Sequence, residues 1–162
     1  MRLHTLAVGS AVTVLALSGL AASTASATPP FNPTPPNPNP PPEAILSGPL
    51  KAKADGITLK IKDDAVVRNF NLTYVPGANS GWHAHPGIVL AVVKTGTVYQ
   101  KLPCQRAKKF TVGQAYTEVG PHFVENRGDV NAELIITQIA PAGTVGPEFR
   151  EDLPKPKCHR RS

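Results

Sequence analysis

The sequence of 162 residues is poor in cysteine, and after its N-terminal apolar run it has no repeat of helical period. The cysteines are isolated, so the C-x-x-C spacing typical of a thiolate metal site is absent. Basic residues give a formal net charge of +6, but they are scattered and form no stripe interleaved with aromatic side chains. These absences argue against a nucleic-acid-binding surface and favour a fold built from strands.

The N-terminus has the pattern of a secretory signal peptide. A basic start at Arg2 is followed by an apolar run over residues 6–20 and by an A-x-A sequence that ends at Ala27. A membrane anchor is the alternative, but the run is interrupted by small polar residues and is short for a bilayer span. No cysteine lies near the cleavage site, which argues against a lipid anchor. We therefore expect cleavage after Ala27, secretion, and no stable membrane insertion afterwards.

A proline-rich stretch separates this signal from the rest of the chain. Nine of the fifteen residues from Thr28 to Pro42 are proline, a composition that favours an extended linker and cannot bury a core. The sequence therefore predicts four parts: a signal peptide (1–27), a linker (28–43), one folded domain (44–145) and a C-terminal tail (146–162). The domain is long enough for a single hydrophobic core.

Short strand patterns punctuated by glycine and proline fill the folded part. Residues 57–62 alternate between apolar and polar, which predicts a half-buried strand, and the continuous apolar run at 88–93 predicts a strand buried on both faces. Residues 116–118 and 122–124 flank a Gly-Pro turn as a predicted pair of strands. Further strands are expected at 65–75, 97–100 and 132–139. This succession predicts an antiparallel sandwich or barrel.

The two cysteines are Cys104, in a predicted turn, and Cys158, close to the C-terminus. An even number of cysteines in an exported chain indicates a disulfide. Such a bond would tie the tail back to the domain. Metal ligation by the thiolates is the alternative.

Two histidines in the middle of the chain have the spacing of metal ligands. His83 and His85 follow a glycine-rich turn, and in an extended strand residues two apart point to the same face. Two convergent imidazoles supply the first two ligands of a divalent transition metal. The alternative is that both rings pack in the core, where each buried imidazole would still need a partner. His4 falls in the signal peptide and His159 in the basic tail.

A third histidine, His122, completes a pattern that resembles the cupin superfamily of small jelly-roll β-barrels. The resemblance covers about residues 45–143, and the overall run also looks like small secreted actinobacterial cupin-domain proteins. The first cupin motif is a glycine, H-x-H, a glutamate and a glycine; the second is a glycine, a turn, a histidine and an asparagine. The matching residues are Gly77, His83, His85 and Gly96 in the first motif and Gly113, Gly120, His122 and Asn126 in the second.

The sequence departs from both motifs. The glutamate of the first motif would stand at position 89, which is Val89. Glu118, four residues before His122, is the candidate to replace it, either as a metal ligand or as a base beside the metal, whereas Glu125 and Glu133 are less well placed. By strict count the histidine of the second motif would fall at Val124. We favour His122 because it keeps the three-residue gap to the motif asparagine.

The resemblance implies a divalent transition metal (Zn, Fe, Mn, Ni or Cu) held by His83, His85 and His122. It implies a metal-dependent oxygenase, isomerase or lyase that acts on a small organic molecule, and a homodimer. The absent motif glutamate leaves open a non-enzymatic barrel that binds a small ligand or a metal, and an inert scaffold with a vestigial site. No residue identifies the substrate.

Overall fold

The computed structural model describes residues 43–158, and within this range it contains twelve β-strands and one short 3-10 helix. The predicted signal peptide, nearly all of the predicted linker, His4 and His159 lie outside the described residues. The elements are β1 (Glu43–Leu46), β2 (Leu50–Ala54), β3 (Ile57–Ile61), β4 (Ala65–Tyr74), β5 (His83–Ala84), β6 (Ile88–Thr95), β7 (Thr97–Lys101), β8 (Lys108–Thr111), β9 (Ala115–Glu118), β10 (Phe123–Glu125), β11 (Ala132–Pro141), η1 (Gly146–Phe149) and β12 (Glu151–Asp152).

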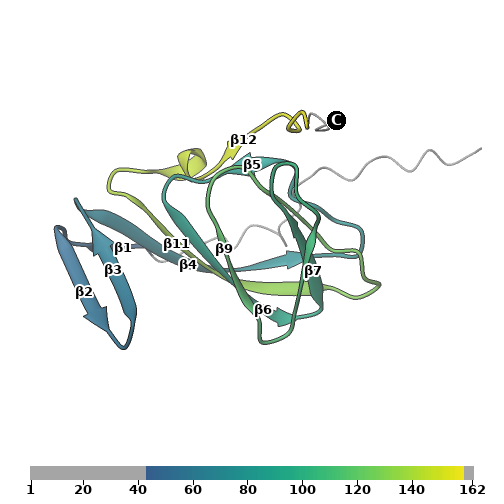
Figure 1. Cartoon of the computed structure of the whole chain (residues 1–162), viewed down its shortest axis with the longest axis horizontal. Helices are drawn as coiled ribbons and strands as arrows, with labels where there is room; N and C mark the ends of the chain where they lie inside the picture. The colour runs from purple at the N-terminus through teal and green to yellow at the C-terminus, as the bar shows by residue number, and fades with distance from the viewer. Residues whose placement is uncertain (1–42, 159–162) are drawn as a thin grey trace, which may run out of the picture.

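Two antiparallel sheets form the barrel (Figure 1). The larger has the order β1-β4-β11-β6-β9 and the smaller β10-β7-β8, with β12 paired to β5 at one end. The core lies between them, because its buried side chains come from both, including Val89 and Leu134 of the larger sheet and Val98 and Phe110 of the smaller. The predicted antiparallel jelly-roll barrel is therefore confirmed.

Glycine is required where β6 meets the strand β11. Gly87 has a φ of +80°, in the left-handed region that L side chains rarely adopt, and a Cβ there would collide with the carbonyl of Ile139. The H-x-H segment ends just before this close approach. Gly87 therefore fixes how the histidine segment leads into the large sheet.

The strand β6 is buried on one face only, so the prediction of a strand buried on both faces is wrong. Val89 is 1% exposed and lies in the core, whereas Ile88 and Leu90 are 45% and 42% exposed on the opposite face. A continuous apolar run is also compatible with a strand whose outer face no other layer covers. This outer face stays partly exposed, and its Ile88 borders a groove shared with Leu59 and Ile61 of the hairpin β2–β3.

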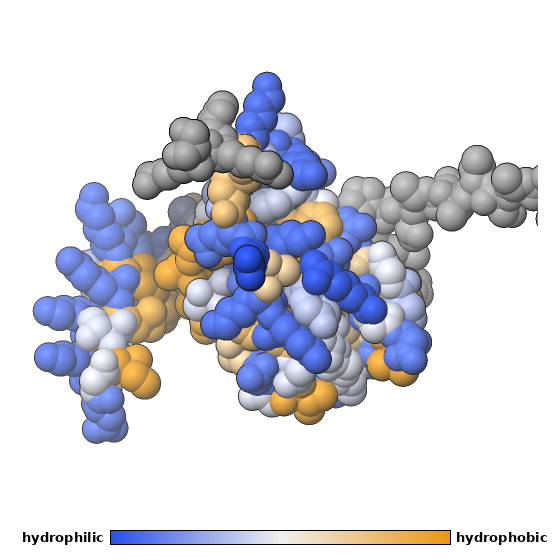
Figure 2. Space-filling model, turned by 45° about the vertical axis from the view of Figure 1, so that its right-hand side comes forward, coloured by the Kyte–Doolittle hydropathy of each residue, from blue (hydrophilic) through white to orange (hydrophobic). Residues whose placement is uncertain are grey.

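The prediction of a half-buried strand at residues 57–62 is also wrong, because the hairpin β2–β3 stands apart from the barrel (Figure 1). Its register gives it one apolar side and one lysine-rich side. Figure 2 shows the hydrophobic side turned toward the barrel. Ile57 is nevertheless 73% exposed, and a groove of about 260 Å³ separates Leu59 and Ile61 from Ile88.

The strands on either side of the Gly120-Pro121 turn do not pair with each other, contrary to the prediction. The strand β9 pairs with β6 in the larger sheet, whereas β10 pairs with β7 in the smaller one. The turn carries the chain from one sheet to the other. This crossing leaves His122 between the two sheets, at the candidate functional site.

The C-terminal residues 146–158, here called the strap, close one end of the barrel. Phe149 is 1% exposed, and Leu153 N donates to the carbonyl of Trp82. The predicted disulfide is present: Cys104 and Cys158 are bonded, with 5.4 Å between their Cα atoms. Phe149, Leu153 and Cys158 thus contact the barrel. Across residues 43–158, no helix has the length and hydrophobicity that a bilayer span requires.

We expect the disulfide to contribute substantially to stability. The bond closes a loop across a sequence separation of 54 residues. Loop-closure entropy for such a length is worth about 4 kcal/mol, so a Cys104→Ser/Cys158→Ser variant should melt roughly 10 °C lower. Thermal unfolding followed by circular dichroism measures this shift. A reducing agent should lower the melting temperature of the parent but not of the variant; equal melting temperatures would contradict the prediction.

Candidate metal centre

Three histidines and one glutamate meet at the strap end of the barrel. One ligand atom from each of His83, His85, Glu118 and His122 can be chosen so that all four lie within 4.8 Å of one another. His122 is fully buried, His83 is 3% exposed and Glu118 is 6% exposed. They come from β5, the residue just after β5, the end of β9 and the turn before β10. Four donor groups of metal-binding type thus converge in a space the size of a metal site.

Cross-strand pairing places His122 beside the H-x-H pair. His83 and His122 form an antiparallel bridge in which each backbone N–H donates to the other's carbonyl, at 3.0 and 2.9 Å. Directly opposite residues share a face, and the two ring centroids are 4.1 Å apart. Val124, the alternative position for the motif histidine, is fully buried in the apolar core. His122 is therefore the histidine that joins the cluster.

A second cross-strand pair places the carboxylate. Val89 stands where the first motif would have its glutamate, and its direct partner on the neighbouring strand is Glu118. Opposite residues of an antiparallel pair present their side chains on the same face, so Glu118 enters the site from the position next to the missing glutamate. Its Oε2 lies 3.4 Å from Nε2 of His85 and 3.3 Å from Nε2 of His122.

The three imidazoles are each oriented by a backbone carbonyl. Nδ1 of His83 lies 3.1 Å from the carbonyl of Gly81, and Nδ1 of His122 lies 2.8 Å from that of Gly120. Nδ1 of His85 lies 2.7 Å from the carbonyl of Phe149, which belongs to the strap. A carbonyl only accepts, so we assign the proton of each ring to Nδ1; for His85 the carbonyl at 2.7 Å decides this over Nε2 of Gln138, which lies 3.1 Å from the same nitrogen. Each Nε2 then has its lone pair available to a metal.

The electrostatics of the site favour metal-binding protonation states. Burial, followed by the nearby positive charges of His122 and Arg150, lowers the pKa of His83 to about 3, so its imidazole is neutral at neutral pH. Burial by itself would raise the pKa of Glu118. The contacts with His122 and His85 outweigh it and hold the pKa of Glu118 at about 2. The site thus combines a neutral imidazole with an ionised carboxylate.

The donor set fits a divalent transition metal. Nε2 of His122 is buried and makes no hydrogen bond, although Oε2 of Glu118 lies 3.3 Å away, an arrangement that costs free energy unless another group engages the atom. Three imidazole nitrogens and one carboxylate oxygen are ligands of zinc, iron, manganese, nickel and copper sites. A metal among the four residues would therefore engage a buried nitrogen that makes no hydrogen bond within residues 43–158.

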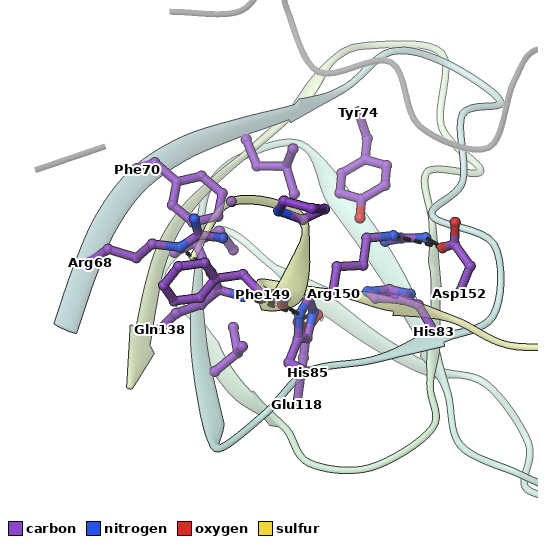
Figure 3. Close-up of a pocket in the computed structure, with 15 residues that line it drawn as sticks. Arg68, Phe70, Tyr74, His83, His85, Glu118, Gln138, Phe149, Arg150 and Asp152 are labelled. Carbon is purple, nitrogen blue, oxygen red and sulfur yellow. Dashed lines mark hydrogen bonds and ion pairs between the residues drawn. The ribbon is translucent and has the colours of Figure 1, made fainter. Parts of the chain in front are cut away.

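A cavity of about 350 Å³ opens beside the cluster (Figure 3). Its walls come from one face of β4, from β11 and from the strap. The residues around it include His83, His85, Glu118, Arg68, Phe70, Leu72, Tyr74, Ile136, Gln138, Phe149 and Arg150. A small molecule bound there would contact both the metal-site residues and an apolar wall.

Sequence reasoning missed the strap and the cationic residues of the cavity. Arg150 donates to the carbonyl of Ser80 and pairs with Asp152, and Arg68 lies at the far side of the cavity. The sequence does carry a signal for Arg68, because it occurs at alternate spacing with Phe70 and other apolar residues of β4. Nothing comparable marks residues 146–152.

The carboxylates judged less well placed indeed lie away from the cluster. Glu125 pairs with Lys101 and Arg127, and Glu133 pairs with Lys94. The Trp82 ring packs against Phe123 rather than lining the cavity. Of the acidic residues considered from the sequence, Glu118 is therefore the one that the fold brings to the histidines.

We expect His83 to remain neutral through the range in which histidines ordinarily titrate. Because burial and neighbouring charges lower its pKa to about 3, its ring signals in the metal-free protein should not shift between pH 8 and pH 5. Nuclear magnetic resonance of ¹⁵N-labelled imidazoles measures this directly, with His83→Gln to assign the signal. A midpoint near 6.5 for His83 would contradict the buried geometry.

No family model and no curated protein matches the chain. Several solved structures resemble it. An oxalate oxidase is 17% identical with a TM-score of 0.40, and the match covers 47% of this chain and 46% of that one. A Cupin_2 domain of an XRE family transcriptional regulator from Enterobacter cloacae is 21% identical with a TM-score of 0.39, over 46% and 80% of the two chains.

A cupin-like protein from Thermotoga maritima is 19% identical with a TM-score of 0.44, over 57% of this chain and 77% of that one. The chain thus spans less than half the length of the oxalate oxidase that it matches. Such distant likenesses say nothing of activity. The chain's own two-sheet topology brings the histidines of both motifs together at one end of the barrel. Its fold is an antiparallel two-sheet β-barrel of the jelly-roll type.

Proposed function

We propose that this barrel binds a divalent transition metal through His83, His85, Glu118 and His122 and uses it on a small organic molecule. One observation carries the proposal. Each imidazole has its Nδ1 against a backbone carbonyl, so that the three Nε2 atoms and one carboxylate oxygen remain to form the convergent cluster. Fixing the tautomer and ring orientation in this way is typical of metal-binding histidines.

The ligand set narrows the chemistry without selecting one metal. Neutral imidazoles are common ligands of zinc, iron, nickel and copper. The carboxylate of Glu118 makes manganese a further candidate, because manganese prefers oxygen ligands. A metal held by these residues would polarise a substrate oxygen or activate dioxygen or water. The protein would supply the orientation of the ligands and a cavity whose apolar walls limit the access of water.

Tyr74 can donate a hydrogen bond to a bound molecule, in competition with its contact to Ser80. It lines the cavity, and Figure 3 shows its hydroxyl directed toward the side on which His83 and Arg150 lie. Burial, with the charge of Glu118, raises the pKa of Tyr74 above its ordinary value. Its hydroxyl therefore stays protonated at neutral pH and can hold a substrate oxygen in place.

Secretion and a disulfide-stabilised domain belong to the same proposal. The Cys104–Cys158 bond suits an oxidising compartment, which supports export by the predicted signal peptide with cleavage after Ala27. Residues 28–43 would then form a spacer ahead of the barrel. The apolar side of the hairpin β2–β3, where Ile57 is 73% exposed, supports the expected homodimer, because a second copy could cover it.

The alternative function is a non-enzymatic barrel that holds a metal or small ligand without turnover. Val89 in place of the motif glutamate favours this alternative. Its partner Glu118 weakens it, because the carboxylate reaches the cluster from the neighbouring strand. We therefore expect turnover. Oxygen uptake and product formation, measured on metal-loaded protein with a panel of small organic molecules, would support an enzyme; stoichiometric metal with no turnover would support the binding module.

We expect the purified parent to carry close to one transition metal per chain, detected by elemental analysis. His122→Ala and Glu118→Val should lose most of it, since each removes one of four ligands. Glu125→Gln, which alters a carboxylate outside the cluster, should retain it. No bound metal in the parent after soaking with each candidate metal would falsify the proposal. A His83→Ala variant is measured alongside. If His83→Ala loses the metal but His122→Ala retains it, His122 is not a ligand.

The pairing of Val89 with Glu118 allows a sharper version of this test. The double variant Val89→Glu/Glu118→Val moves the carboxylate to the directly opposite strand position, on the same face of the sheet. It should recover a large part of the metal that Glu118→Val loses. A double variant as empty as the single one would show that the carboxylate is needed at position 118 and not merely on this face.

A further inference from the structure

Arg68 extends along the cavity wall with its guanidinium held between two aromatic rings. Its Cζ lies 3.5 Å from the ring centroid of Phe149 and 5.4 Å from that of Phe70. Figure 3 shows the two rings on opposite sides of the Arg68 guanidinium. The side chain is 15% exposed. The rings cover the faces of the planar group, so a partner can approach it only at its edge.

The described residues leave Arg68 with hydrogen-bonding capacity to spare. Its Nε donates to Oε1 of Gln138, and the carboxylate of the half-exposed Glu43 forms an ion pair with the guanidinium at 3.9 Å from Nη1, which is beyond hydrogen-bond distance. A guanidinium has five N–H groups, and this one borders the cavity. Arg150, the other arginine of the cavity, differs because its Nη2 contacts both Asp152 and the carbonyl of Ser80.

An incompletely paired cation at low exposure is costly unless an anion joins it. A carboxylate suits this site because it is planar and can accept two parallel N–H bonds at the edge of a guanidinium. The cavity walls include apolar side chains such as Leu72 and Ile136, and the amide of Gln138 links Arg68 to His85 at one point of the wall. The cavity volume of about 350 Å³ is at the small end of the range for ligand pockets, roughly 300–1,000 Å³.

We infer that Arg68 is an anion-binding residue and that the cavity takes small organic carboxylates with an apolar body. The carboxylate would pair with the edge of Arg68, and the body would extend along the apolar wall toward the histidine cluster. This inference names the ligand class of the proposed function. The Arg68 contacts themselves require no metal, so the two ideas can be tested separately.

The test uses benzoate and benzamide, which share a shape but differ in charge. Isothermal titration calorimetry on the exported chain, freed of metal with a chelator, should show benzoate binding at least 10-fold more tightly than benzamide. A charge-assisted hydrogen bond accounts for about a 10- to 100-fold change in affinity. Arg68→Met should therefore weaken benzoate binding by about that factor and leave benzamide binding unchanged.

Two further variants separate ligand binding from a structural role. Arg127→Met removes an arginine that stacks on Tyr99, outside the cavity lining, and should leave benzoate binding unchanged. Arg68→Lys keeps the charge but loses the planar fork, so its affinity for benzoate should be intermediate. If Arg68→Met lowers the melting temperature and weakens both ligands equally, Arg68 is only a clamp for Phe149 and the inference is overturned.

Elemental analysis of the same proteins distinguishes this inference from the metal proposal. Metal content should be the same in Arg68→Met and in the parent. A benzoate preference in protein that binds no metal would keep the inference and reject the metal site. Absence of benzoate binding in both the metal-free and the zinc-loaded protein would reject the inference, whatever the metal content.

Discussion

The site depends on the rule that directly opposite residues of antiparallel strands point to the same face. This constraint acts twice. It places His83 beside His122 through the isolated antiparallel bridge between these two residues. It also sets Glu118 opposite Val89 within the larger sheet. A sequence that lacks the expected glutamate on one strand can thus present a carboxylate from the next. The chemistry of the cluster follows from pairing register rather than from motif spacing alone.

Burial then determines which nitrogen of each of the three imidazoles faces the cluster. A buried imidazole must satisfy both ring nitrogens, and here a backbone carbonyl lies beside Nδ1 of each ring, which leaves Nε2 to the centre. For His85 this carbonyl belongs to Phe149 of the strap. The ring of the same residue stacks on Arg68. The strap, which the Cys104–Cys158 disulfide ties to the barrel, therefore connects ligand orientation to the shape of the cavity.

The sequence predicted the barrel and the convergence of His83 with His85 because period-two alternation reflects local strand geometry. It predicted the disulfide from the even number of cysteines in a chain with an export signal. It also singled out Glu118, though its link to Val89 depends on register, which a single sequence does not reveal. Periodicity shows which residues share a face but not whether another layer covers it. For this reason the exposed faces of β6 and of the hairpin were predicted as buried.

The roles of Arg68 and of the strap were not predicted from the sequence, for two different reasons. The alternation of β4 places Arg68 on an apolar face. A single charged residue in such a pattern indicates a binding site only once the structure shows a cavity beside it. Residues 146–152 form a 3-10 turn and a two-residue strand, which carry no periodic pattern at all. Their role comes from the long-range contacts that Phe149 and Arg150 make with the barrel.

The most direct measurement of the central claim is X-ray absorption spectroscopy on the zinc-loaded, disulfide-intact protein. The account predicts a shell of three imidazole nitrogens and one carboxylate oxygen, at about 2.0–2.2 Å, with any remaining position open to the cavity. The imidazole scattering should fall by one ring in His122→Ala. A sulfur ligand, or a shell with fewer than three imidazoles in the parent protein, would contradict the account.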